Sequence, residues 1–198
     1  MSSFIFIGPP GVGKGTQRVK FEEKYKCGSI VPGDLLREEV SKGTELGLRL
    51  SGILSQGLLA PHDIVMNVVE NKLRFFKDNG VKNIIFDGFP REKEQAEALE
   101  KLLLGEYAIY SVKCVLLFKV SDKTVFERIH HRLTTGSSPR ADDKSDDVIK
   151  TRLKVFYDKI KNVIEIFNKA GIVHEIDASG DVSSVFRLTD DILAKFME

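Results

Sequence analysis

The segment GPPGVGKGT, residues Gly8 to Thr16, directly follows the apolar run Phe4–Ile7 and precedes a stretch of helical composition that continues to Tyr25. Its glycines allow the backbone to turn successive N–H groups inward, which forms an anion-binding nest at a helix N-terminus. Lys14 adds a mobile cation that can reach terminal phosphates. This order, with a strand followed by a glycine-rich loop, a lysine and a helix, predicts a loop that binds the phosphates of a nucleoside triphosphate.

The rest of the chain alternates short apolar runs with longer stretches of helical composition. The predicted strands are Phe4–Ile7, Ser29–Val31, Asn83–Phe86, Val112–Phe118 and Ile172–Ile176. The predicted helix ends are marked by Gly43, Gly57, Gly80, Gly105 and Gly171, and Pro61 marks a helix start. Strands that alternate with helices indicate an α/β fold, with a five-stranded parallel sheet and helices on both faces.

An apolar stripe follows Asp146 in alternating steps of four and three residues. It consists of Ile149, Leu153, Phe156, Ile160, Val163 and Phe167. A coiled coil would need more heptads than the stripe provides before Gly171. We therefore predict one long helix that packs this stripe on the sheet.

Composition limits the function classes. The 198 residues fit a single domain, and 30 Lys and Arg residues nearly balance 29 Asp and Glu residues. This balance argues against a nucleic-acid or membrane-surface binder. The two cysteines, Cys27 and Cys114, are far apart and are expected to be buried, inert thiols. No signal peptide or membrane span is recognisable, so we expect a cytoplasmic protein.

The residue after Lys14 is Gly15, and the hydroxyl that helps to hold magnesium comes one position later, as Thr16. This GKGT ending resembles that of the nucleoside monophosphate kinases rather than that of GTPases. The nearest candidate for a guanine-reading NKxD motif, Asn168 to Gly171, lacks the aspartate. A GTPase is therefore excluded.

Further motifs extend the resemblance to the adenylate kinases of the short-lid type. The matching segments are Pro32–Arg37 (PGDLLR), Asp87–Arg91 (DGFPR) with Gln95, the arginines between Arg128 and Arg152, and the late loop Asp177–Val182. The match runs from Phe4 to about Phe186. It implies a P-loop nucleoside triphosphate hydrolase-like fold as a single domain over residues 1–198. Within it, the resemblance implies an acceptor-binding insertion at about 31–62 and a short lid at about 133–144.

The resemblance also implies an activity, namely reversible magnesium-dependent transfer of the terminal phosphate of ATP to AMP, which gives two ADP. The implied substrates are ATP and AMP, and a monomer is expected. The lid segment has no cysteines, so no structural zinc is expected. Alternatives are a UMP/CMP or GTP:AMP kinase, or a catalytically silent sensor of adenine nucleotides. The preference between ATP and GTP as donor stays open.

Roles follow residue by residue from the matching motifs. Catalytic roles are implied for Lys14, Arg37, Arg91, Arg128, Arg132, Arg140 and Arg152. ATP binding is implied for Gly11, Val12, Gly13, Lys14, Gly15, Thr16, Arg128 and Gly180. AMP binding is implied for Pro32, Arg37, Leu58, Leu59, Ala60, Gly88, Phe89, Pro90, Arg91, Gln95, Arg140 and Arg152. The implied magnesium contacts are Asp87, which acts through water, and Thr16.

The chemistry accounts for this set of side chains. Transfer between two nucleotides brings two polyanions together, and the acceptor is a phosphate that is already ionised at neutral pH and needs no strong base. Catalysis then depends on positioning and on charge neutralisation, for which the planar fork of arginine is well suited. Four arginines lie outside all motifs and are interpreted as solvated surface residues. They are Arg18, Arg49, Arg74 and Arg187.

Two departures from the family pattern bear on the acceptor and the lid. Pro32 stands where the family usually has Thr or Ser, so it offers the acceptor base neither a hydroxyl nor a backbone N–H. The base contacts are then expected from Gln95 and from the backbone of Leu58 to Ala60. Gln95 favours adenine over a pyrimidine by resemblance, although its amide pairs with cytosine as well. Pro139, just before Arg140, is expected to stiffen the lid.

Overall fold

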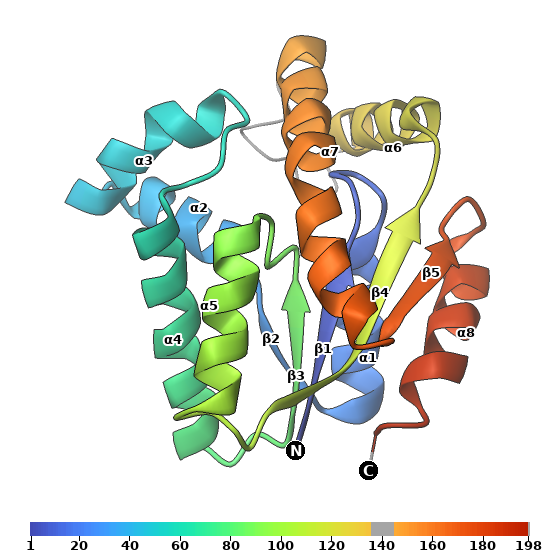
Figure 1. Cartoon of the computed structure of the whole chain (residues 1–198). Coiled ribbons are helices and arrows are strands. Elements are labelled where there is room, and N and C mark those ends of the chain that lie inside the picture. The colour runs from blue at the N-terminus through green and yellow to red at the C-terminus, as the bar shows by residue number, and fades with distance from the viewer. Residues whose placement is uncertain (136–144, 198) are drawn as a thin grey trace.

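The computed structural model describes residues 1–135 and 145–197. Its five strands form one parallel sheet in the order β2-β3-β1-β4-β5 (Figure 1). The strands are β1 (Ser2–Ile7), β2 (Gly28–Ile30), β3 (Asn83–Asp87), β4 (Ser111–Lys119) and β5 (Val173–Asp177). Each strand that the sequence predicts is present, and the predicted α/β fold class is confirmed.

At least one helix of the described residues follows each strand, with three between β2 and β3 and two between β4 and β5. They are α1 (Lys14–Tyr25), α2 (Pro32–Lys42), α3 (Glu45–Ser55), α4 (His62–Asp78), α5 (Lys93–Leu104), α6 (Asp122–Thr135), α7 (Asp146–Lys169) and α8 (Val182–Leu193). Gly43 follows α2 with a φ of 65°, a left-handed conformation that glycine adopts without strain. Thr44 then caps α3 by accepting the N–H of Gly47.

Each face of the sheet is covered by helices, and side chains of strand β1 pack into the hydrophobic cores on both faces. Ile5 and Ile7 point into a core shared with α4, α5 and α7, whereas Phe4 and Phe6 point into a core shared with α1 and α8. The alternation follows from the period of two in a strand. Because all four side chains are almost completely buried, each contributes about 1.5–3 kcal/mol to folding. The phosphate loop therefore starts from a strand that is held firmly on both sides.

The apolar stripe of α7 divides between two partners. Its C-terminal half, with Ile160, Val163 and Phe167, packs in the core against the sheet as predicted. Its N-terminal half does not reach the sheet, because Ile149 and Leu153 form a separate cluster with Val125 and Ile129 of α6. The prediction that the whole stripe covers the sheet is thus wrong for the first turns. The helix extends beyond the sheet edge and meets α6 there (Figure 1).

The sheet brings the ends of distant segments to one edge. In parallel strands the carboxyl ends lie together, which is where ligands bind in open α/β sheets. Strands β1 and β3 are neighbours, with Phe6 opposite Asp87 in the register, and the N–H of Gly88 donates to the Phe6 carbonyl at 3.0 Å. The loop after β1 and the motif after β3 are thereby placed side by side.

Cys27 and Cys114 are buried free thiols, as predicted. Burial raises the pKa of Cys27 to about 11 and that of Cys114 to about 12. Both therefore stay protonated and unreactive at neutral pH. Among the described residues, the helices are either too short or too polar to cross a lipid bilayer.

Candidate active site

The loop between β1 and α1 has the backbone that an anion site requires. Gly11 and Gly13 have φ values of 80° and 107°, in the left-handed region that other residues rarely adopt. Gly13 is the N-cap of α1 and has no side chain with which to cap it. The N–H groups of the first turn of α1 are consequently presented to the loop, at the positive end of the helix dipole.

Lys14, the first residue of α1, reaches back over the start of the loop. Its Nζ donates to the carbonyls of Gly8 and Pro9 at 2.7 Å and 3.0 Å. The ammonium group is therefore held beside the nest, within the loop that the sequence singled out. Thr16 is exposed on the same first turn.

Arg128 joins the phosphate loop to the loop that follows β5. From α6, its Nη1 donates to the Val12 carbonyl at 2.9 Å, and its Nη2 donates to the carbonyls of Ala178 and Gly180 at 2.8 Å and 3.2 Å. The structure thus brings together Arg128, Val12 and Gly180, which the sequence assigned to one substrate. The Asp181 carboxylate accepts the N–H groups of Ser183 and Ser184, and these bonds lower the pKa of Asp181 and cap α8.

Asp87 ends β3 and is 7% exposed. A Cβ atom added at Gly15 would lie 3.8 Å from Asp87 Oδ2, so this carboxylate lies beside the first turn of α1. The chain then turns at Gly88, with a φ of 66°, and the Arg91 Nε donates to the Gly88 carbonyl at 2.6 Å. The buried Asp87 carboxylate thus lies beside the turn that carries the Thr16 hydroxyl and beside the anion-binding loop. This arrangement fits Mg²⁺, which takes few protein ligands when it binds with phosphates.

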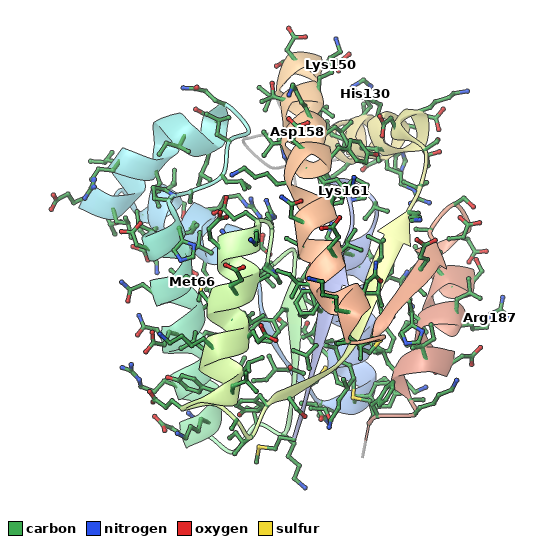
Figure 2. The ribbon with its side chains drawn as sticks, viewed as in Figure 1. Met66, His130, Lys150, Asp158, Lys161 and Arg187 are labelled. Carbon is green, nitrogen blue, oxygen red and sulfur yellow. The ribbon has the colours of Figure 1, made fainter. Side chains whose placement is uncertain are left out.

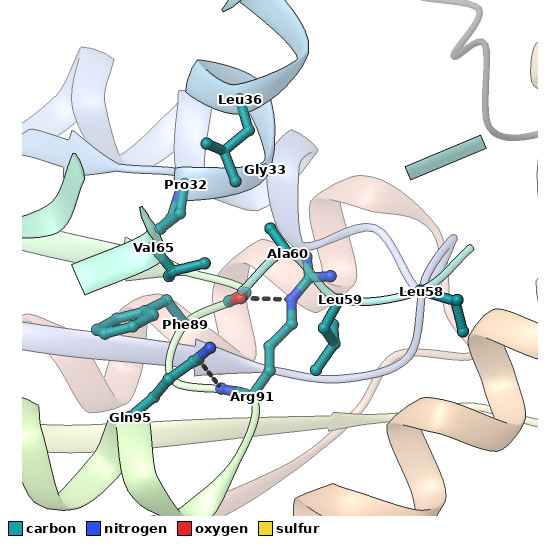
Figure 3. Close-up of a pocket in the computed structure, with 11 residues that line it drawn as sticks. Pro32, Gly33, Leu36, Leu58, Leu59, Ala60, Val65, Phe89, Arg91 and Gln95 are labelled. Carbon is teal, nitrogen blue, oxygen red and sulfur yellow. Dashed lines mark hydrogen bonds between the residues drawn. The ribbon is translucent and has the colours of Figure 1, made fainter. Parts of the chain in front are cut away.

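A pocket opens next to Arg91, between the β3–α5 loop and α2 (Figure 3). Eight of the predicted acceptor residues line it, and they are Pro32, Leu58, Leu59, Ala60, Gly88, Phe89, Arg91 and Gln95. Gly33, Leu36 and Val65 also line it and were missed, because glycine and apolar residues on helices carry no chemical signature in a sequence. Gln95 points toward the pocket from α5, and its Oε1 accepts the Arg91 N–H at 2.9 Å (Figure 3).

Two further predicted arginines come from elements that flank this pocket. Arg37 lies one turn beyond Gly33 on α2 and forms an ion pair with Asp34. Arg152, on α7, lies against Gly57, where an added Cβ would come within 2.6 Å of its Cγ. Gly57 directly precedes Leu58, so α7 carries Arg152 to the segment that lines the pocket.

The remaining predicted residues lie on α6, in the β3–α5 loop or outside the described residues. Arg132 lies one turn beyond Arg128 on α6 and is half-buried. Pro90 is buried in the β3–α5 loop. Arg140, Pro139 and most of the predicted lid at about 133–144 lie outside the described residues. The elements on either side of that segment are joined by a hydrogen bond between His130 Nε2 and Asp146 Oδ1 at 2.7 Å.

Arg18 corrects one interpretation of the sequence. The sequence alone predicts a solvated surface residue at this position, but the Arg18 side chain is only 17% exposed. Its Nε donates to Asp87 Oδ2 at 3.3 Å, and its Nη1 donates to Glu22 and to Ser29 Oγ. Arg18 lies one turn beyond Lys14 on α1, and this spacing is the signal that could have placed it on the loop side of the helix.

Replacing Arg18 by methionine is expected to lower the free energy of unfolding by about 1–3 kcal/mol, because Asp87 loses a charged donor while it stays buried. Urea denaturation measures this change. Arg187→Met is the matched control, since Arg187 is exposed on α8 (Figure 2) and its loss should cost no more than about 0.5 kcal/mol. Equal effects of the two substitutions would contradict a structural role for the Arg18–Asp87 pair.

Comparisons with known proteins agree with this geometry. The sequence model of the adenylate kinase family matches residues 6–172. An adenylate kinase of Prochlorococcus marinus (strain NATL2A) is 37% identical over 182 residues, which cover 92% of this chain and 93% of that protein. An adenylate kinase of Archaeoglobus fulgidus is 31% identical over 217 residues and covers 98% of both chains. Adenylate kinase isoenzyme 1 of Caenorhabditis elegans is 36% identical over 183 residues, with 92% and 83% covered. This chain belongs to the adenylate kinase family.

Proposed function

We propose that this protein transfers the terminal phosphate of ATP to AMP, reversibly and with magnesium, to give two ADP. The observation that carries the proposal is the adjacency of two anion-binding features at one sheet edge. The glycine-rich nest with Lys14 follows β1, and the Arg91-bearing pocket follows the neighbouring strand β3. A single triphosphate site would need only the first of these features.

The donor triphosphate would lie on the loop from Gly11 to Thr16. Backbone N–H groups of the loop and of the first turn of α1 would bind its oxygens, and Lys14 would move from the Gly8 and Pro9 carbonyls to the terminal phosphates. Arg128 and Gly180 would border the donor at the β5–α8 loop.

The acceptor would occupy the pocket beside Arg91. Arg37 and Arg91 would hold its phosphate, since the guanidinium fork binds phosphate oxygens in pairs. Its base would lie among Pro32, the segment Leu58–Ala60 and Gln95, which line the same cavity. Gly88, Phe89 and Pro90 would shape the wall between base and phosphate.

Charge neutralisation would provide most of the rate acceleration. The ionised acceptor phosphate is itself the nucleophile, so no general base is required. Arg132, Arg140 and Arg152 would contact the transferring group, on whose oxygens charge is spread in the transition state. Such donors act strongly because they are oriented before the reaction begins.

Asp87 and Thr16 are the groups that would hold magnesium, with the carboxylate acting through water. Bound there, the ion would supply positive charge that offsets the negative charge of the phosphates during transfer. Arg18 donates to Asp87 Oδ2, and this hydrogen bond orients the carboxylate.

Closure over both substrates would exclude water and prevent wasteful hydrolysis of ATP. The segments proposed to move are the insertion at about 31–62, which contains the packed pair α2 and α3, and the short lid at about 133–144. All the proposed contacts come from one chain, which suits a monomer.

An acceptor panel tests the proposal. Purified protein with ATP and magnesium is expected to phosphorylate AMP faster than CMP, UMP or GMP, and a reaction without acceptor should release little phosphate. Coupled detection of ADP measures these rates. Faster turnover of CMP or UMP would favour a pyrimidine monophosphate kinase, and no turnover with any acceptor would favour a silent nucleotide sensor. GTP in place of ATP tests the donor.

A further inference from the structure

Glu92, at the start of α5, makes contacts that its position in a helix cap does not explain. It occupies the N-cap of α5, yet its side chain forms no capping hydrogen bond. Its carboxylate is turned toward Gln95 instead, and its Oε1 accepts the Gln95 Nε2–H at 3.2 Å. With only 13% of its side chain exposed, this is a largely buried carboxylate beside the acceptor pocket.

The charge of Glu92 is balanced from another element. Lys159 of α7 forms an ion pair with Glu92 Oε2, so the two carboxylate oxygens are divided between Lys159 and Gln95. Burial of a carboxylate is unfavourable unless the group is paired and hydrogen-bonded. Lys159 therefore compensates the charge of Glu92 and holds its carboxylate beside the Gln95 amide.

These contacts determine which way the Gln95 amide faces. Its Oε1 accepts the Arg91 backbone N–H, and its Nε2 donates to Glu92. Turning the amide over would set Nε2–H against the Arg91 N–H and Oε1 against the Glu92 carboxylate, which are two repulsive contacts. Because Gln95 is 2% exposed, water cannot compensate for them. After both bonds are made, the amide retains one N–H donor and one oxygen lone pair for a ligand.

Because the free donor and acceptor of the Gln95 amide are fixed in position, they distinguish bases by the order of donor and acceptor atoms along the edge of the base. Adenine presents an exocyclic amino donor next to a ring-nitrogen acceptor, and Gln95 can complement this pair. Hypoxanthine, in IMP, presents a carbonyl acceptor next to a ring N–H, which is the reverse. It would bind Gln95 well only if the amide turned over.

We propose that Glu92, held by Lys159, positions the Gln95 amide so that the acceptor pocket selects a 6-amino base over a 6-oxo base. This inference rests on the proposed function, since it takes the pocket to bind a nucleoside monophosphate. Glu92 and Lys159 act through Gln95 and are positioning residues. AMP and IMP are the matched probes, because they differ in this edge and share their ribose phosphate.

The decisive variant is Glu92→Ser. Serine is a preferred N-cap residue, so a purely structural role for Glu92 predicts unchanged or greater stability and an unchanged preference for AMP. Positioning predicts that the ratio of kcat/KM for AMP to that for IMP falls by about tenfold, mainly through KM, as a charge-assisted hydrogen bond is lost. Glu92→Gln is expected to act in the same direction, because its amide can donate to a Gln95 that has turned over.

Two substitutions on α7 test the contribution of Lys159. Lys159→Met removes the ion-pair partner of Glu92 and is expected to lower the same ratio by about threefold. Lys161→Met removes the same charge from an exposed site two residues further along the helix (Figure 2), and it should leave the ratio unchanged.

Calorimetric titration of AMP and IMP without ATP separates this inference from the proposed function. If the wild type binds AMP over IMP but does not turn it over, the proposed activity fails and the ratio of affinities still tests positioning. If the wild type phosphorylates AMP and the Glu92→Ser ratio stays within twofold of the wild-type value, positioning by Glu92 is wrong and the activity stands. Absence of binding of either nucleotide to the wild type would overturn both.

Discussion

Replacement of Arg91 by alanine is expected to lower the turnover number for phosphate transfer from ATP to AMP by about 100- to 1,000-fold. Arg91 follows β3 directly and lies at the boundary between the acceptor pocket and Asp87, where two sets of phosphates would meet. Removal of one oriented donor leaves part of the transition-state charge without compensation. The reaction should therefore slow far more than AMP binding weakens.

The fold should tolerate this change, because Arg91 is exposed and its Nε contact is with a loop carbonyl. Steady-state rates at saturating ATP and AMP measure the catalytic effect, and urea denaturation measures stability. Arg187→Ala, at an exposed position on α8, is the control and should leave both nearly unchanged. A loss of turnover below about threefold for Arg91→Ala would mean that its assignment to the acceptor phosphate is wrong.

Gly47→Ala is expected to disrupt the packing of α2 against α3. A Cβ atom at Gly47 would lie 2.1 Å from the Glu39 carbonyl oxygen and 2.8 Å from the Val40 Cα. Both are backbone atoms of α2, so no side-chain rearrangement relieves the clash and α3 has to move. We expect the free energy of unfolding to fall by about 3 kcal/mol or more.

The same substitution should also impair acceptor binding. The segment from Leu58 to Ala60 lines the pocket and follows α3 after two residues of turn, so a displaced α3 carries it away. The KM for AMP is expected to rise by about tenfold or more, whereas the KM for ATP should change less than about twofold.

Gly52→Ala is the matched control on the same helix. No atom lies within 4 Å of a Cβ added there, and alanine favours the helix over glycine by up to about 1 kcal/mol. It should therefore leave stability unchanged or slightly increased. Equal behaviour of the Gly47 and Gly52 variants would contradict the predicted close packing of α2 and α3.

Local sequence was sufficient to predict the phosphate loop and the five strands. Gly8 to Thr16 and the elements on both sides of it span fewer than about 25 residues, so the signals for strand, turn and helix are all contiguous. The five apolar runs likewise predict buried strands, because a parallel sheet covered on both faces requires continuous apolar segments. The predicted acceptor residues came from the resemblance to a known family, and eight of them line one cavity in the structure.

Contacts between distant segments were not predictable in this way. Arg18 reaches Asp87, which is 69 positions away, and Arg128 reaches Val12, which is 116 positions away. The division of the α7 stripe between α6 and the sheet depends on where the sheet edge ends. A single sequence contains no signal for that boundary, since the same period of apolar residues fits either partner.

By itself, the sequence determined a phosphate-binding loop on a parallel α/β sheet and the side chains that surround it. Only the tertiary structure decided which charged groups meet, including Arg18 with Asp87 and Lys159 with Glu92. The physical reason is that backbone conformation depends on neighbours along the chain, whereas hydrogen bonds and ion pairs depend on side chains a few ångströms apart in space. Those distances exist only once the helices have packed on the sheet.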